Sequence, residues 1–352
     1  MGTVYDADGN VVITDDELLG LEDLIPNRIL VWHDEFKDSK IDPEKWEHIY
    51  SVDYAKDLSL VTETGNGLKY RTIRDNRPNV NDYTWSSAEL LTKSKFEFKY
   101  GRIEAKIKFP SNNPYHSTFW TLGACYDRYS VEEGVSYAEG GVKFPSCGEI
   151  DIAEFDNGSV GARTHWSTNG FDQSDGFATG GNISSLTSTP TSWHIYSAEW
   201  TESAITFYVD GVQKGTWSIS NGAVSGWNPF MHPHFIILNC IPFVSGTPTW
   251  DIAETQVAWV RVYAPSGVSE YIPETGISIP ANASVSVGGR HWLGTPTFTP
   301  SSPSDMTVKW LSHNPEIVTC YGGMLVGVSA GTTFVQATSK HGFTALCKVT
   351  VS

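Results

Sequence analysis

The sequence has few positive charges and no long apolar run. It holds 24 lysine and arginine residues against 40 aspartate and glutamate residues, a net charge of −16. A field of that sign repels phosphate backbones and anionic lipid, so nucleic acid is not an expected partner. No stretch approaches the roughly 18 uninterrupted apolar residues of a membrane helix, so membrane insertion is not expected either. A neutral substrate, or no substrate at all, fits this charge better.

Metal-binding spacings are also missing. The five cysteines (Cys125, Cys147, Cys240, Cys320 and Cys347) lack the CxxC pattern of a zinc site. Cys320 and Cys347 alternate in phase with apolar neighbours and are expected to face a core, paired or not. The run from Asp6 to Glu17 superficially resembles a calcium loop, but Val11 stands where the sharp turn of such a loop needs glycine. No metal and no cofactor is predicted.

Helical periodicity is scarce as well, and what fills the chain is strand after strand. Segments such as "ILVWHDEF", "FEFKYGRIEAKIKF", "EIDIAEF" and "AITFYVDGVQKGTW" are rich in β-branched and aromatic residues, with turn-forming residues between them. Residues 102–108 alternate polar and apolar side chains, as in a strand with water on one face. The sequence therefore predicts an all-β protein built on an antiparallel sandwich or barrel.

Composition divides the chain into four parts. Residues 1–28 are acidic and lack strand alternation, so they are predicted to form an N-terminal arm, in which "DDELLGLEDLI" is either a short helix or an arm lying on the domain surface. The strand-rich region is 29–265, and 266–275 is a linker of Pro, Ser and Gly. Residues 276–352 hold short strands of low charge, enough for a small immunoglobulin-like β-sandwich. Few contacts are expected across the linker, and a monomer is expected.

Three carboxylates stand within six residues of one apolar strand. Glu149 and Asp151 share a face, but Glu154 joins them only if a β-bulge accommodates one extra residue. The two glutamates are then about 13 Å apart at the backbone, and their side chains can converge to the approximately 5–5.5 Å of a retaining glycosidase. One glutamate would act as nucleophile and the other as acid/base, with Asp151 between them as the charge that tunes their pKa values. A solvated acidic strand or a cation site is the alternative.

The motif "GEIDIAE", preceded by "FP" and followed by "THWS", resembles the active-site strand of glycoside hydrolase family 16, in its laminarinase-like, bulged branch. The resemblance extends over about residues 29–265. It implies a β-jelly roll of the concanavalin A-like sandwich type, with an open cleft for β-linked polysaccharide cut internally with retention. It also implies nucleophile, assisting and acid/base roles for Glu149, Asp151 and Glu154.

The same resemblance suggests residues that bind sugar. His165 falls where the family often has a histidine beside the acid/base. Trp120 and Trp166 fall on cleft strands, and Trp85 is expected there too, although core packing is an equal alternative for each indole. Phe144 stands where laminarinase-like members usually carry tryptophan. Other departures are His116-Ser117-Thr118 in place of "WPA" and residues 240–246 in place of a Gly-rich turn.

The C-terminal segment resembles a bacterial immunoglobulin-like domain of group 2, through "W.S.NP.IV" and "GVSAGTT". Such modules occur on exported and phage tail proteins, which implies an extracellular, cell-surface or virion-associated bacterial protein. Three functions stay open: an endo-β-1,3-glucanase that also accepts mixed-linkage glucan, an endo-β-galactosidase of the agarase, porphyranase or host-glycan type, and a non-catalytic glycan-binding adhesin. For a sulfated galactan, Arg163 is the candidate cation.

Overall fold

The structure is a computed structural model that describes residues 4–5, 11–13, 21, 23–38, 40–47, 55–56, 58–74, 85–112, 115–130, 137–241 and 249–352. Apart from three short 3-10 helices, the regular elements of these ranges are β-strands. The short helices are η1 (Leu58–Leu60), η2 (Ile219–Gly222) and η3 (Pro229–Met231). The predicted all-β class is confirmed. Within the same ranges, no helix has the length and apolar character needed to cross a membrane.

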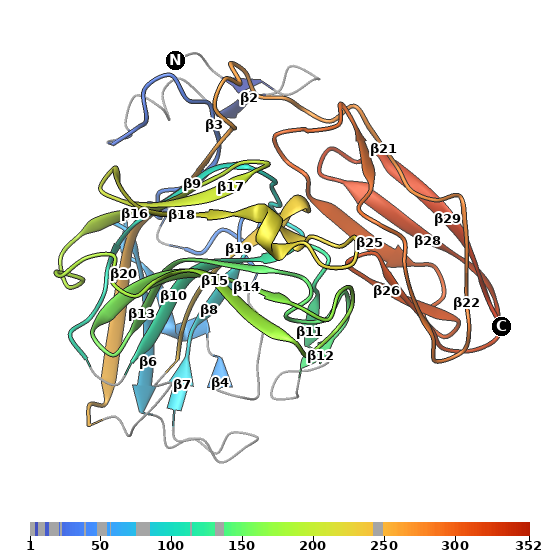
Figure 1. The fold of residues 1–352 in the computed structure, drawn as a ribbon, viewed down its shortest axis with the longest axis horizontal. Helices are drawn as coiled ribbons and strands as arrows, with labels where there is room; N and C mark the ends of the chain where they lie inside the picture. The colour runs from blue at the N-terminus through green and yellow to red at the C-terminus, as the bar shows by residue number, and fades with distance from the viewer. Residues whose placement is uncertain are drawn as a thin grey trace.

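Two large sheets lie one over the other and form a sandwich (Figure 1). The six-stranded sheet has the order β15 (Phe177–Ile183), β14 (Ser159–Ser167), β13 (Glu149–Asp156), β10 (His116–Gly123), β19 (His234–Ile241) and β8 (Glu89–Leu91). The ten-stranded sheet runs β18 (Val212–Ser218), β17 (Ala204–Val209), β16 (His194–Trp200), β9 (Gly101–Lys108), β20 (Ile252–Tyr263), β6 (Leu68–Arg74), β7 (Trp85–Ser87) and β4 (Ala55–Lys56). Its remaining strands, β3 (Leu30–Asp34) and β5 (Val61–Glu63), pair with β20 and β6.

The core lies between these two sheets because their strands alternate. On β9, Ile103 and Ile107 are at most 2% exposed and point inward. On β13, Ile150 and Ile152, at 3% and 1% exposure, point inward from the opposite sheet. Burial of this apolar surface is the main driving force for the sandwich. Since the six-stranded sheet turns only one face to the core, its other face is available for the carboxylates.

The N-terminal arm differs in part from its prediction. Two short strands, β1 (Val4–Tyr5) and β2 (Val11–Ile13), pair there as an antiparallel hairpin that the sequence pattern did not reveal. Most of the predicted short helix, 15–25, lies outside the described residues. Its last part does not form a helix, and Leu21, Leu24 and Ile25 pack against the main core.

The C-terminal strands form smaller sheets beside the sandwich (Figure 1). β21 (Gly276–Ser278) pairs with β24 (Thr297–Thr299); β22 (Asn282–Val285), β29 (Thr344–Val351), β28 (Gly331–Ser339) and β25 (Val308–Ser312) make a second sheet; β23 (Arg290–Trp292), β27 (Met324–Gly327) and β26 (Val318–Tyr321) make a third. Cys320 and Cys347 are buried among them and form no disulfide with each other. The contacts of these strands with the large sandwich test the expectation that few contacts cross the linker.

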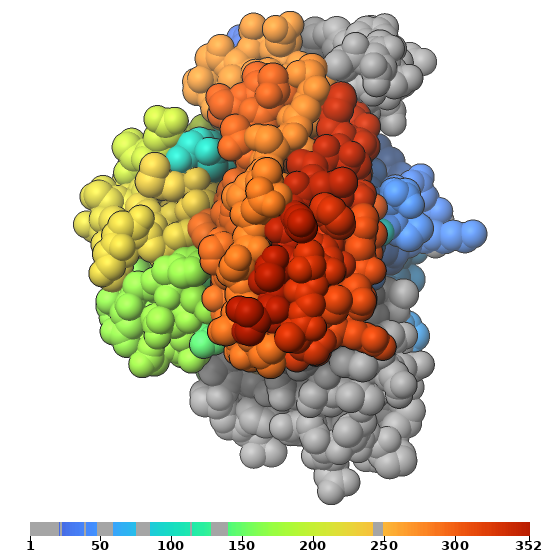
Figure 2. Space-filling model, turned by 90° about the vertical axis from the view of Figure 1, so that its right-hand side faces the viewer, coloured from blue at the N-terminus to red at the C-terminus, as the bar shows by residue number. Residues whose placement is uncertain are grey.

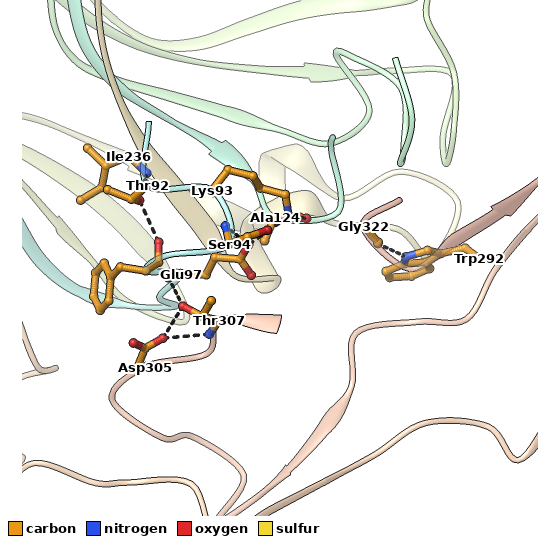
Figure 3. A network of polar contacts seen from close by, with 11 residues as sticks. Thr92, Lys93, Ser94, Glu97, Ala124, Ile236, Trp292, Asp305, Thr307 and Gly322 are labelled. Carbon is orange, nitrogen blue, oxygen red and sulfur yellow. Dashed lines mark hydrogen bonds and ion pairs between the residues drawn. The ribbon is translucent and has the colours of Figure 1, made fainter. Parts of the chain in front are cut away.

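That expectation is wrong: the C-terminal strands are packed against the sandwich. Figure 2 shows them, orange to red, flanked on one side by the yellow and green segments of the sandwich. Trp292 lies with its ring centroid 5.1 Å from those of Phe171 and Trp227. In Figure 3, the amide N–H of Glu97 donates to Oγ1 of Thr307 at 2.8 Å. The Pro, Ser and Gly content of residues 266–275 therefore did not mean that the parts on either side of this segment make few contacts.

We expect Trp292→Ala to destabilise the whole chain, because the indole packs on aromatic rings of the sandwich. Truncation of a well-packed large aromatic costs about 3 kcal/mol, which for a chain of this length corresponds to a melting temperature roughly 4 °C lower. Differential scanning calorimetry of the full chain measures it. Phe334→Ala is the matched control, since that ring is 43% exposed on the same C-terminal strands. Equal melting temperatures for the two variants would show that the interface adds no stability.

Candidate active site

The predicted bulge is present in β13. Opposite Asp151 stand Trp120 on β10 and Arg163 on β14, and opposite Glu154 stand Thr118 and Gly161. Each neighbouring strand advances two residues while β13 advances three, so β13 contains one extra residue. This extra residue brings Glu154 onto the face that Glu149 and Asp151 already share.

The three carboxylates occupy the face of the sheet that points away from the core. Phe155 and Ile152, at 0% and 1% exposure, point into the sandwich on the other side. The side chains of Glu149 and Glu154 keep 12% and 17% of their surface exposed, and that of Asp151 only 4%. Two carboxylates that a ligand can reach thus flank one that is almost buried.

Glu154 is held between two basic side chains. Nε of Arg163 lies 2.6 Å from Oε2 of Glu154, an ion-pair contact without the angle of a hydrogen bond. Nε2 of His116 lies 4.0 Å from Oε1. Burial raises the pKa of Glu154 to about 7, the negative charge of Asp151 adds to the rise, and Arg163 opposes it. A carboxyl with this pKa can both give and take a proton near neutrality.

His116 is a neutral imidazole because it is buried. Burial lowers the pKa of its imidazole, with the carboxylate of Asp156 opposing the shift. Its Nε2 also lies 3.0 Å from Oγ1 of Thr118, which faces the site from the same strand. A neutral imidazole next to Glu154 offers a hydrogen-bonding group and does not add a second full cation.

The other end of the cluster is organised around His165. Its Nε2 lies 3.3 Å from Oδ2 of Asp151 and 3.8 Å from Oε1 of Glu149, while Nδ1 lies 2.9 Å from the hydroxyl of Thr179. His165 was expected beside Glu154; the structure places it beside Asp151 and Glu149 instead, because it is directly opposite Glu149 on β14. The histidine nearest to Glu154 is His116.

Glu149, Asp151 and His165 are close enough to share a cation. Their ligand atoms lie within 4.8 Å of one another, and no other such group of three occurs among the described residues. Oxygen and imidazole ligands in that number suit a transition ion. The same atoms are the candidate catalytic groups, so a cation bound there would compete with any chemistry they perform.

Two of the predicted sugar-binding residues do line this face. Trp120, opposite Asp151, shares its face and donates from Nε1 to Oδ1 of Asn239 at 3.1 Å. Phe144 lies with its ring 6.0 Å from that of Phe177. Phe177 in turn stacks on His165 at 4.6 Å. Aromatic surface therefore stands on both sides of the carboxylates.

The prediction is wrong for the other two indoles. Trp166 is on β14 but follows His165 directly, so its side chain points to the opposite face and packs in the core on Trp217, 5.1 Å away. Trp85 belongs to the ten-stranded sheet and is 6% exposed, against Trp250 and under the guanidinium of Arg74. Both follow the core-packing alternative.

Sequence reasoning missed several residues of the site. Phe177 is 58% exposed beside His165, and its only signal was an apolar residue at the start of a polar strand. Arg163 was considered as a cation for sulfate and not as the partner of Glu154. Its place two residues before His165 on one strand was the available signal.

Of the departures from the family pattern noted in the sequence, Ser117 points inward to the hydroxyls of Tyr70 and Thr255. Residues 242–246 lie outside the described residues.

Comparison with known proteins gives related sequences and a related fold. A β-glucanase from Rhodothermus marinus is 31% identical over 203 residues, covering 53% of this chain and 65% of the relative. A keratan-sulfate endo-1,4-β-galactosidase from Sphingobacterium multivorum is 29% identical over 270 residues, covering 71% and 58%. The crystal structure of LamA from Zobellia galactanivorans, in complex with laminaritriose and laminaritetraose, is 28% identical with a TM-score of 0.54, covering 67% of this chain and 99% of that one.

The chain spans between 36% and 65% of the length of the four curated relatives that it matches. The sequence profile of glycosyl hydrolases family 16 matches residues 50–261, more than half of the chain. The protein therefore belongs to glycosyl hydrolases family 16.

Proposed function

We propose that this protein is a retaining, endo-acting glycoside hydrolase that cuts β-1,3-glucan and also accepts mixed-linkage β-glucan. The observation that carries the proposal is the bulge in β13, which gathers Glu149, Asp151 and Glu154 on one open face. An open face with aromatic surface on both sides suits a long chain bound along its length, which is what internal cleavage requires.

In the proposed mechanism, the carboxylate of Glu149 attacks the anomeric carbon of the sugar. The glycosidic C–O bond breaks, and Glu154 gives its proton to the leaving oxygen. An ester now joins Glu149 to the sugar. Glu154, left as a carboxylate, takes a proton from a water molecule, whose oxygen attacks the same carbon and releases Glu149. Retention follows from two displacements at one carbon.

The neighbours of the two glutamates fit this division of labour. Burial and the charge of Asp151 raise the pKa of Glu154, which keeps its proton available for the first step. Nε2 of His165 lies 3.3 Å from Oδ2 of Asp151, so an imidazole stands against Asp151 on the side of Glu149, whereas Glu154 faces the guanidinium of Arg163. The result is a pair of carboxyls whose environments differ, the usual basis for separate acid and nucleophile roles.

The relatives support glucan as the substrate. The R. marinus protein is a β-glucanase, and the LamA structure holds laminaritriose and laminaritetraose, which are short β-1,3-glucan chains. The faces of glucose rings are apolar, and Trp120, Phe144 and Phe177 offer aromatic surface for them. The net charge of −16 also suits an uncharged polysaccharide.

An endo-β-galactosidase is the second candidate, favoured by the similarity to the S. multivorum enzyme and by Phe144. A sulfated chain would need a free cation in the cleft, however, and Arg163 is engaged with Glu154 at 2.6 Å. A purely adhesive protein would have no need of a carboxyl whose pKa is raised to about 7. Both alternatives are therefore second to the glucanase.

For the C-terminal part we propose a bacterial immunoglobulin-like domain of group 2 in residues 276–352, after a catalytic part of 29–265 and a linker of 266–275. Its sequence signatures and its small separate sheets support this division. Because polysaccharide is broken down outside cells, we propose that the protein acts at the cell surface, in secreted form or on a virion, as a monomer.

The first prediction from the proposed function concerns the carboxylates. Glu149→Gln should lower kcat on laminarin by about 10³-fold or more, since a neutral amide cannot attack the anomeric carbon. Glu154→Gln should still release the phenol of activated aryl glycosides in the first step, because that leaving group needs no proton, while the second step is slowed because no base activates the water. Reducing-end assays and circular dichroism give activity and fold. Turnover by folded Glu149→Gln would contradict the mechanism.

The second concerns pH. Glu154 must be protonated to act as acid, so kcat/KM should fall as pH rises through about 7, the pKa of its carboxyl. Arg163 lowers that pKa, so Arg163→Gln should move the alkaline limb to higher pH. Asp151 raises it, so Asp151→Asn should move the limb to lower pH. Profiles between pH 5 and 9 measure both shifts, with Arg74→Gln on the other sheet as control. A limb that stays in place in both variants would exclude Glu154 as the acid.

The third separates glucan from galactan. Phe144→Trp should shift the ratio of kcat/KM on β-1,3-glucan to that on β-galactan toward glucan by about 1–3 kcal/mol, if the space beside the smaller ring accommodates an axial hydroxyl. Purified linear polysaccharides of matched length measure the ratio. An unchanged ratio would mean that Phe144 does not select the sugar.

A further inference from the structure

Of the connection between β10 and β13, residues 124–127 and 140–148 pack over one end of the carboxylate face. The connection leaves the sheet after Gly123 and returns directly into Glu149. Side chains from this connection, from the face itself and from the C-terminal strands are buried in one apolar cluster, with Phe144 packed against it; its members include Leu122, Cys125, Tyr126, Val142, Cys147, Phe235 and Met324. The placement of this connection therefore sets where Phe144 stands and where β13 begins.

Arg290, on β23 of the C-terminal strands, holds the returning arm of that connection. Its Nε and Nη2 bind the carboxylate of Asp172 in a fork, at 2.7 and 2.9 Å. Nη2 also donates to the carbonyl of Gly141. Asp172 in turn accepts the amide N–H of Lys143 at 3.1 Å. One guanidinium thus fixes two backbone groups immediately before Phe144, with the directional geometry that arginine forks provide.

The turn between β26 and β27 supports the same connection at close range. A Cβ on Gly322 would stand 2.3 Å from the carbonyl oxygen of Cys125, and one on Gly140 would stand 2.4 Å from Cβ of Tyr321. The carboxyl of Asp127 also accepts the amide N–H of Gly322. Only glycine permits such an approach. Both arms of the connection therefore rest on the C-terminal strands.

A separate set of contacts attaches the C-terminal strands elsewhere on the sandwich. The amide of Met306 donates to the carbonyl of Glu97 at 2.7 Å, next to the Glu97–Thr307 bond visible in Figure 3. Nζ of Lys340 donates to the carbonyl of Lys95 at 3.0 Å. These contacts lie on the turn after β8. Lys340 thus makes the same kind of contact as Arg290, a cation on a carbonyl of the sandwich, but on a different segment.

We propose that Arg290 is a positioning residue for the active site. By holding residues 141–143 it keeps Phe144 and the start of β13 in place, so that the C-terminal strands form part of the wall of the sugar cleft. This inference rests on the proposed function, because the ligand concerned is a β-1,3-glucan chain long enough to reach Phe144. Sugar units bound away from Phe144 do not depend on Arg290.

The experiment compares Arg290→Ala, Arg290→Lys and the control Lys340→Ala in the full chain. Hydrogen exchange is measured at Val142, Cys147 and Gly148, whose amides donate within the connection. We expect exchange at these amides to rise on the order of 10-fold in Arg290→Ala, a local opening, and to stay unchanged in Lys340→Ala. Arg290→Lys keeps the charge without the fork and should fall between them; it also serves if Arg290→Ala does not fold.

The same variants are assayed on laminari-oligosaccharides of increasing length. Arg290→Ala should raise KM by about 10-fold for chains long enough to reach Phe144, the usual effect of losing one binding contact, with smaller changes in kcat and on short chains. A fall of kcat/KM by one common factor at all lengths, or equal exchange in Arg290→Ala and Lys340→Ala, overturns the proposal. If the wild-type protein cuts no β-glucan, the proposed function fails, and the exchange comparison alone decides the positioning role.

Discussion

The inserted residue in β13 is the constraint on which both the core and the site depend. In a regular strand, Ala153 would follow Asp151 on the open face, and Glu154 would point into the sandwich. With the insertion, Phe155 is fully buried and Glu154 faces outward. A shift by one residue exchanges every side chain between the two faces of a sheet. The bulge therefore cannot be lost without burying a carboxylate and exposing an aromatic ring at the same time.

The carboxylates on the open face are met by groups from the neighbouring strands: one guanidinium, which supplies the positive charge, and two imidazoles, which supply ring nitrogens. Arg163 and His165 come from β14 and His116 from β10, each opposite or next to a carboxylate of β13. Even so, burial and Asp151 outweigh Arg163 at Glu154, whose pKa is raised to about 7. A stronger neutralisation would have left both glutamates ionised, and a weaker one would have made the ionised form of Glu154 harder to reach. Intermediate compensation is what general acid/base chemistry near neutrality needs.

Local sequence predicted the features that depend only on the alternation of side chains between the two faces of a strand. The spacing of Glu149, Asp151 and Glu154 among isoleucines was enough to predict the bulge and the shared face. The same parity argument, applied to the adjacent pair His165 and Trp166, would have directed only one of them to the site. Trp85 could not be assigned this way, because parity does not tell which sheet a short strand joins. Arg290 and Asp172 are 118 residues apart, and no periodicity signals such a contact.

The contact between the C-terminal strands and the sandwich also has a cause in the chain itself. The connection between β10 and β13 is long, and buried backbone groups outside a sheet need partners. The connection supplies some of these partners itself; for example, the amide of Val142 donates to the carbonyl of Cys125. Others come from the C-terminal strands, such as the guanidinium at the carbonyl of Gly141. A longer connection can shape the end of a cleft only if something holds it. In this protein a neighbouring set of sheets does so, which joins two units of different sequence character into one site.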